Sequence, residues 1–145
     1  MKHRIAARVL LKENNKILFI RYEMKQTVFY ALPGGAHEVG ESLANCAQRE
    51  IKEETAIDVD IKHCLLVNEF TSQPFNLHQV EIIFLAQRST SQIVDAATFQ
   101  DPGMTGFHWL SKVEMEQVQF YPEKPIDWFF KDYAVSNDIY FHQKR

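Results

Sequence analysis

The sequence predicts a mixed α/β (α+β) sandwich, and three observations support this fold class. Apolar extended runs fill most of the first 31 residues and return between residues 58 and 89. One amphipathic helical pattern separates the two groups, and shorter helical patterns follow near the C-terminal end. Because strands and helices come in groups, a regular βαβ array is disfavoured.

Length and composition bound the class of protein. The chain has 145 residues, 46% of them hydrophobic and 24% charged, so we expect one globular domain over residues 1–145. The net charge is −3 without a basic stripe, so nucleic acid is not an expected partner. Neither a signal-peptide core nor an apolar stretch near the roughly 20 residues of a membrane span is seen. A cytoplasmic protein with no membrane partner is expected, with Cys46 and Cys64 as free thiols.

The N-terminal third is predicted to be extended. Residues 4–23, "RIAARVLLKENNKILFIRYE", read as two strands joined by the turn-forming "ENNK", which predicts a hairpin. The next segment, "MKQTVFYALPGG", ends at Pro33 and the pair Gly34-Gly35. Glycine permits positive φ and a close approach of the backbone to another group.

A helix is predicted from Ser42 to about Thr55. Leu43, Ala47 and Ile51 recur every four residues, and serine is a good N-cap. Two long strands follow, residues 58–72 and 76–89, with a turn at Pro74 to Asn76 between them. Residues 90–106 carry turn chemistry and are predicted to be a surface loop before a short strand at 107–110. Residues 111–118 and 122–135 are predicted to form a short helix and a terminal helix.

Three carboxylates crowd together near the end of the first helix. Glu50 and Glu54 are i,i+4 neighbours and Glu53 lies beside both, so all three project over an arc of about 100°. A solvated face with an Arg49–Glu53 pair is the alternative interpretation. Against it, acidic side chains in the last turn are unfavourable by about 0.3–1 kcal/mol each, because the helix dipole is negative there. Oxygen ligands of this kind suit a hard cation such as Mg²⁺.

The double glycine adds to this interpretation. A Gly34-Gly35 turn just before the helix can bring a backbone carbonyl or amide close to a cation or a phosphate, where a Cβ would obstruct. Alone it indicates only a turn. Together with the carboxylates it indicates a functional site.

Residues 35–57, "GAHEVGESLANCAQREIKEETAI", resemble the signature of the Nudix hydrolases. Gly35, Glu41 and the run from Arg49 to Ile57 stand at the spacing of that family, except that Ala56 replaces the usual glycine. The resemblance implies an α/β/α sandwich with a mixed central sheet. Because a left-handed helix end costs a residue with a Cβ about 1–2 kcal/mol, the helix is expected to end differently here.

The resemblance also implies roles for residues in and before this segment. Mg²⁺ or Mn²⁺ would be held by Glu50, Glu53 and Glu54, with Glu53 alternatively the base. Arg49 would orient a catalytic carboxylate and, with Glu41, hold the loop to the helix. Substrate would meet Tyr30, Gly34 and Gly35, the last offering its carbonyl to the metal.

The implied reaction is hydrolysis of a diphosphate bond in a nucleoside diphosphate derivative or nucleoside triphosphate, by attack of water at phosphorus. Some members of the family take the base from outside the signature, and Asp95 and Asp101 in the late loop are candidates. Glu69 and Glu81, on predicted strands, could also face the site. The histidines do not cluster in sequence, so none is predicted to be a ligand.

The sequence leaves the substrate class open. Pro74 lies where members that cleave ADP-ribose tend to carry proline, and Phe75 lies where dinucleoside polyphosphate hydrolases usually carry tyrosine. A Nudix domain that binds a nucleotide as a sensor is the alternative function, and an interaction protein with a merely solvated acidic helix is a third. The C-terminal "DWFFKDY" either packs in the core, the preferred interpretation, or forms half of a homodimer contact.

Overall fold

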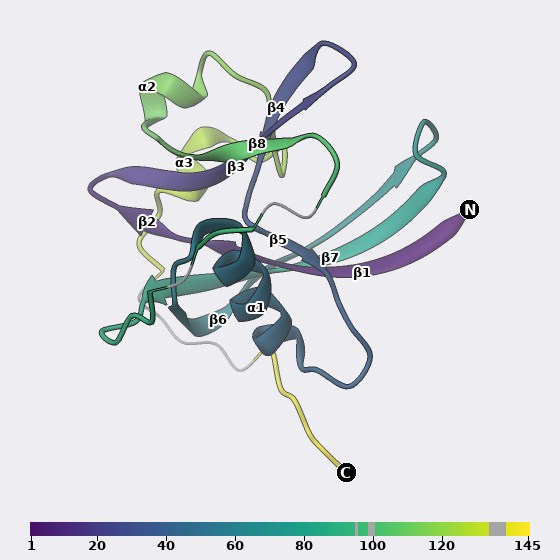
Figure 1. The fold of residues 1–145 in the computed structure, drawn as a ribbon, viewed down its shortest axis with the longest axis vertical. Coiled ribbons are helices and arrows are strands. Elements are labelled where there is room, and N and C mark those ends of the chain that lie inside the picture. The colour runs from purple at the N-terminus through teal and green to yellow at the C-terminus, as the bar shows by residue number, and fades with distance from the viewer. Residues whose placement is uncertain (95, 99–100, 134–138) are drawn as a thin grey trace.

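The computed structural model describes residues 1–94, 96–98, 101–133 and 139–145, and these residues form two mixed β-sheets (Figure 1). Sheet 1 has four strands in the order β5-β1-β7-β6. In that order their bounds are Gly34–Ala36, Lys2–Leu10, Leu77–Arg88 and Val59–Ser72. β1 pairs with β7 in parallel and with β5 antiparallel. The predicted fold class is confirmed, with the β-structure divided between two sheets.

Sheet 2 has five strands, four of them in the order β2-β3-β4-β9, and β8 pairs with β3. The bounds of β2, β3, β4, β9 and β8 are Lys12–Glu13, Lys16–Met24, Thr27–Ala31, Phe120–Tyr121 and Met104–Leu110. β8 therefore begins before the strand predicted at 107–110. An additional hairpin turn, unpredicted from sequence, joins β3 to β4 at Lys25 and Gln26, both with positive φ.

The first predicted hairpin is only partly correct. The turn is present, because Asn14 and Asn15 have φ of 50° and 59°, but it joins β3 to the two-residue strand β2. β1 instead pairs within sheet 1. The physical reason is that Leu10 and Leu11 are both buried but in different core clusters. The chain therefore passes from one sheet to the other at this point.

Helix α1 spans Leu43–Thr55 and packs on sheet 1 through an apolar cluster that includes Ala47 and Ile51. The Ser42 hydroxyl caps it by accepting a hydrogen bond from the Asn45 amide at 3.0 Å. The predicted pairing of the strands now seen as β6 and β7 is also confirmed. The expectation of a different helix end was wrong, because Ala56 takes the left-handed conformation (φ 63°) and its amide donates to the Lys52 carbonyl.

Two short helices lie beside sheet 2, α2 at Lys112–Met115 and α3 at Ile126–Phe129 (Figure 1). The predicted terminal helix is thus much shorter than expected, because turn structure follows Phe129; residues 134 and 135 lie outside the described residues. Trp128 and Phe129 are buried, which confirms core packing of this segment. Within the described residues, no helix has the length and apolar character required to cross a bilayer.

Candidate active site

The double glycine brings β5 against both β1 and α1. Gly34 pairs with Arg8 and Gly35 with Ala7 across the antiparallel ladder. A Cβ on Gly34 would lie 2.2 Å from the Ala7 carbonyl oxygen, and a Cβ on Gly35 would lie 2.6 Å from the Glu50 carboxylate. Both distances are far below van der Waals contact. Glycine at both positions therefore allows strand and helix to meet.

Glu54 is the most enclosed of the three carboxylates. Its residue is 2% exposed, and Oε1 accepts a hydrogen bond from the Gly34 amide at 2.8 Å. Oε2 is buried without a hydrogen-bond partner among the described residues. Burial raises the pKa of Glu54 to about 8, and the negative charges of Glu50 and Asp101 add to this, against the Gly34 hydrogen bond and Arg8. An ionised carboxylate here lacks compensation for one oxygen.

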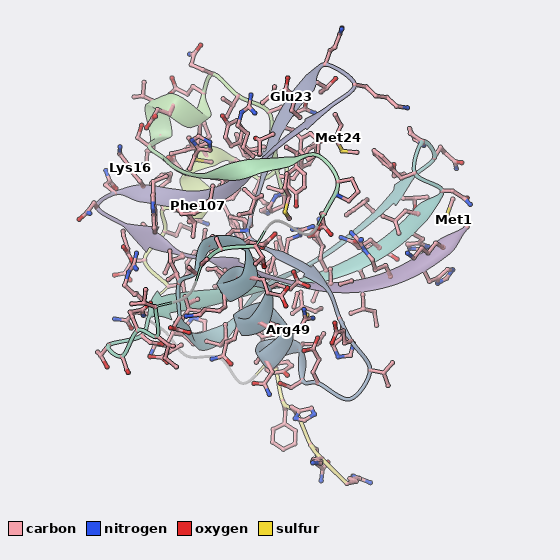
Figure 2. The ribbon with its side chains drawn as sticks, viewed as in Figure 1. Met1, Lys16, Glu23, Met24, Arg49 and Phe107 are labelled. Carbon is pink, nitrogen blue, oxygen red and sulfur yellow. The ribbon has the colours of Figure 1, made fainter. Side chains whose placement is uncertain are left out.

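Arg49 links the loop before α1 to the carboxylates on the helix (Figure 2). Its Nε and Nη2 bind the two Glu41 oxygens at 3.0 and 2.8 Å. Its Nη1 contacts Glu50 at 3.0 Å and Glu53 at 3.5 Å. The hydrogen bonds from Arg49 lower the pKa of Glu41 to about 2. This fork of contacts fixes the orientation of the side chains around it.

The loop before β8 approaches the same carboxylates. Burial raises the pKa of Glu50, and the charges of Glu53 and Asp101 add to the effect while Arg49 opposes it. Asp101 acts on the pKa of Glu54 in the same direction. The side chain of Asp101 therefore lies within electrostatic reach of both carboxylates, as an exposed residue at the margin of the cluster.

Beside the cluster, sheet 1 carries a buried ion pair. Arg8 of β1 donates to Glu81 of β7, and its Nη1 donates to the Leu32 carbonyl at 2.8 Å. The pKa of Tyr22, in sheet 2, is raised mainly by burial. The charge of Arg8 lowers this pKa and the charge of Glu54 raises it, so both groups lie near the Tyr22 hydroxyl. These groups form the polar surroundings of Glu54 on the side away from α1.

The arrangement provides hard oxygen donors of the kind that Mg²⁺ and Mn²⁺ prefer. The unpartnered Glu54 Oε2 and the nearby Glu50 carboxylate fit a divalent cation, because burial disfavours the ionised form of both groups and a bound cation would stabilise that form. As the side chains stand, no group of three or more His, Cys, Asp or Glu residues within the described ranges is arranged to hold a metal. Arg49 supplies positive charge to Glu50 and Glu53 instead.

Comparison with known families identifies the domain. A family model described as the NUDIX domain matches residues 1–129. The chain belongs to the Nudix family. The segment from Gly35 to Ile57 is thus its Nudix signature, and the resemblance read from sequence is confirmed.

Curated Nudix relatives match over part of their length. One, the NAD-capped RNA hydrolase NudC of Vibrio atlanticus, is 40% identical over 46% of this chain and 23% of its own. Another, the ADP-ribose pyrophosphatase of Methanocaldococcus jannaschii, is 34% identical over 56% of this chain and 48% of its own. The chain therefore spans about a quarter to a half of these relatives.

Solved structures share the Nudix fold at low sequence identity. A NUDIX hydrolase from Nitrosomonas europaea superposes with a TM-score of 0.75 at 19% identity, covering 98% of both chains. A MutT NUDIX hydrolase from Burkholderia pseudomallei gives a TM-score of 0.67 at 20% identity, covering 83% of this chain and 92% of its own. These similarities concern the fold.

Within this Nudix domain, most of the predicted site residues lie together around α1, and the others lie apart from them. The first group meets around α1 and comprises Gly34, Gly35, Glu41, Arg49, Glu50, Glu53 and Glu54. Tyr30 is separate: it packs with the cluster around α2 and α3, and its ring contacts His108 edge to face. Glu69 binds His78 at 2.7 Å. Asp95 lies outside the described residues, whereas Asp101 lies near the cluster.

The sequence interpretation missed Arg8 and Tyr22 and gave Glu81 only a general place on a strand. A signal for the ion pair was available. Arg8 interrupts the apolar run "IAARVLL" and Glu81 interrupts "VEIIFL", and charges are rarely buried unless paired. Their pairing itself, between residues 73 apart, requires the parallel register of β1 and β7.

Proposed function

We propose that this Nudix protein hydrolyses a diphosphate bond in a nucleoside diphosphate derivative, using Mg²⁺ or Mn²⁺ held by Glu50 and Glu54, with Glu53 either a third ligand or the base. The observation that carries the proposal is the Glu54 carboxylate. One of its oxygens is buried without a partner, next to a second carboxylate whose pKa is also raised. A protein that needed only a stable helix would gain from an apolar residue there.

The residues of the cluster have different roles in the hydrolysis. A bound divalent ion would neutralise charge on the phosphate oxygens and lower the pKa of a bound water from about 15.7. Arg49 holds Glu50 and Glu53 through its Nη1. Glu53, the more exposed of these two, accepts the proton as the water oxygen bonds to phosphorus and the bridging P–O bond breaks. Asp101 is the alternative acceptor from outside the signature.

The names of two relatives support a class of substrate. ADP-ribose and NAD, which appear in those names, both contain adenosine diphosphate joined to a second ribose. We therefore place a small-molecule nucleotide of this kind first among the substrates. A single domain of residues 1–145 acting in the cytoplasm is part of the same proposal.

The test is hydrolysis of a panel by the wild type and Glu54→Gln, with Mg²⁺ or Mn²⁺. The panel contains ADP-ribose, NADH, a sugar nucleotide, a dinucleoside polyphosphate and normal and oxidised nucleoside triphosphates. Turnover that Glu54→Gln reduces at least a hundredfold supports the proposal. Glu123→Gln, an exposed carboxylate change near α3, is the matched control and should retain activity. Binding of a nucleotide without turnover by the wild type would instead support the sensor function.

A further inference from the structure

Tyr22, on β3 of sheet 2 (Figure 1), has a hydroxyl group that no described residue satisfies. Its ring stacks on Phe29 of β4, with the centroids 5.0 Å apart and the planes 6° from parallel. The residue is 9% exposed, and its oxygen is not enclosed as the unpartnered Glu54 Oε2 and Gln79 Nε2 are. The hydroxyl therefore lies at the accessible end of a buried, firmly packed ring.

Charged groups from three other segments surround this hydroxyl. Burial is the main reason that the pKa of Tyr22 is raised. The charges of Arg8 and Arg4 on β1 lower it. Those of Glu54 on α1 and Asp101 in the loop before β8 raise it further. Because charge interactions weaken with distance, all four side chains lie around the tyrosine oxygen, which places it beside the proposed metal ligand Glu54.

Arg4 adds further unsatisfied donors on the same face of sheet 1 as Arg8. The parallel register sets Arg4 beside Gln79 of β7, and strand alternation places Arg4 and Arg8 on one face. The Arg4 Nε donates to the Gln79 side-chain oxygen, and its terminal nitrogens have no hydrogen-bond partner among the described residues. Glutamine is neutral, so the charge of Arg4 stays uncompensated, whereas Glu81 neutralises Arg8.

Each sheet thus presents an unpartnered donor toward the region of Glu54. The guanidinium of Arg4 can only donate hydrogen bonds, and the raised pKa of Tyr22 keeps its hydroxyl proton in place. A negatively charged group with several acceptor oxygens complements such donors best. Phenylalanine at position 22 would stack on Phe29 without the cost of desolvating a hydroxyl. The tyrosine oxygen is therefore better explained by a ligand than by packing.

We propose that Tyr22 is a substrate-binding residue that donates a hydrogen bond to the substrate's diphosphate, and that Arg4 binds the same diphosphate. Gln79 is the positioning residue that orients the Arg4 guanidinium. Since Glu50 and Glu54 lie on α1, the diphosphate would meet groups from α1 and from both sheets. This inference rests on the proposed function and adds the residues that recognise the phosphates.

Tyr22→Phe tests the hydroxyl, because it removes one oxygen and keeps the stacked ring. On the substrate that the panel identifies, we expect KM to rise about tenfold and kcat to stay within about threefold, as the loss of one hydrogen bond to a charged group allows. Tyr121→Phe is the matched control, since Tyr121 packs edge to face on Phe29, and it should keep the wild-type KM. An unchanged KM in Tyr22→Phe would overturn the inference.

Arg4→Gln tests the second contact and should also raise KM about tenfold. Arg21→Gln is its matched control, because Arg21 binds Thr105 and Glu23 on the opposite face of β3 from Tyr22. It should keep the wild-type KM. A wild-type KM in Arg4→Gln would show that Arg4 does not bind the diphosphate.

The positioning role of Gln79 requires a double-mutant comparison. Gln79→Met should raise KM in the wild type and leave kcat nearly unchanged, but it should have no further effect on KM in Arg4→Gln. A merely structural role would give the same loss in both backgrounds, and that result would remove Gln79 from the proposal.

Binding of inorganic pyrophosphate isolates the phosphate contact from the nucleoside. Calorimetric titration of Glu54→Gln with pyrophosphate should give a dissociation constant about tenfold higher once Tyr22→Phe is added. If Tyr22→Phe weakens the binding of ADP-ribose but not of pyrophosphate, Tyr22 contacts the nucleoside and the inference fails.

The two proposals can fail separately. If no compound is hydrolysed but pyrophosphate binding depends on the Tyr22 hydroxyl, the proposed hydrolysis fails and the phosphate contact stands. If compounds are hydrolysed and Tyr22→Phe changes neither KM nor pyrophosphate binding, the contact fails and the hydrolysis stands.

Discussion

The backbone amide of Gly34 donates a 2.8 Å hydrogen bond to Oε1 of Glu54, across the junction between β5 and α1. The contact joins the glycine that directly precedes the Nudix signature to the acidic helix within that signature. It satisfies only one carboxylate oxygen, because Oε2 is buried without a partner in the described part of the chain. The fold therefore holds Glu54 at an energetic cost that a bound cation would offset.

Divalent metal should stabilise the folded protein through this carboxylate. We expect Mn²⁺ at 100 times its dissociation constant to raise the free energy of unfolding by about 2.7 kcal/mol. Glu54→Gln should show little or no such increase, since it removes the charged ligand. Urea denaturation with and without Mn²⁺ measures both effects, and Glu123→Gln should respond as the wild type does. A full metal response in Glu54→Gln would contradict the assignment of Glu54 as a ligand.

The two glycines should respond differently to alanine. Gly35→Ala places a methyl group 2.6 Å from the Glu50 carboxylate, so it should displace that side chain and weaken Mn²⁺ binding about tenfold or more. Gly34→Ala meets the Ala7 carbonyl oxygen at 2.2 Å with φ at +152°, so it should lower the free energy of unfolding by about 3 kcal/mol or more. Calorimetric Mn²⁺ titration and urea denaturation separate the effects. Wild-type metal affinity in Gly35→Ala would show that Glu50 is not a ligand.

The Glu41–Arg49 pair should make stability depend on pH in acid. Because Arg49 lowers the pKa of Glu41 from 4.5 to about 2, the folded state binds the proton more weakly than the unfolded state does. The contribution is complete above pH 4.5 and disappears as the pH falls toward 2. At pH 6, Glu41→Gln should cost about 1.5–3 kcal/mol of unfolding free energy. That difference from the wild type should shrink when measured at pH 3.

Glu38→Gln is the matched control for this pH series. Glu38 also faces Arg49, but at 3.8 Å and with its side chain 70% exposed. Exposed pairs of this kind contribute at most about 1 kcal/mol, so its substitution should have little effect at either pH. A constant difference between Glu41→Gln and the wild type from pH 6 to pH 3 would show that charge is not the source of the stabilisation.

Local sequence patterns were sufficient to predict the elements whose contacts lie close together in the sequence. The cap at Ser42 and the four-residue recurrence of Leu43, Ala47 and Ile51 predicted α1, and helix geometry then placed Glu50 and Glu54 on one side. The turn near Pro74 was enough to predict the β6–β7 pairing. In these cases the residues that determine the structure lie within a few positions of one another.

Contacts between distant segments were not predictable in the same way. The pairing of β1 with β7, rather than with β3, depends on which surfaces are buried after both sheets form. That register sets His3 opposite His78 and brings Arg8 to Glu81. The neighbouring histidines and the buried ion pair are consequences of topology, and their residues are far apart in the sequence. Periodicity carries no information about such pairings.

Ala56 stands where the family usually has glycine, and it still adopts the left-handed conformation that ends the helix. Its φ of 63° and ψ of 15° are left-handed, a conformation that costs alanine about 1–2 kcal/mol relative to glycine. We therefore expect Ala56→Gly to raise the free energy of unfolding by about 1 kcal/mol, after allowing for the greater freedom of glycine in the unfolded chain. Ala44→Gly, within the right-handed first turn of α1, should instead lower it by about 0.5–1 kcal/mol. Urea denaturation measures the free energy of unfolding of both variants. If Ala56→Gly lowered it as much as Ala44→Gly does, the helix would not end in a left-handed residue in solution.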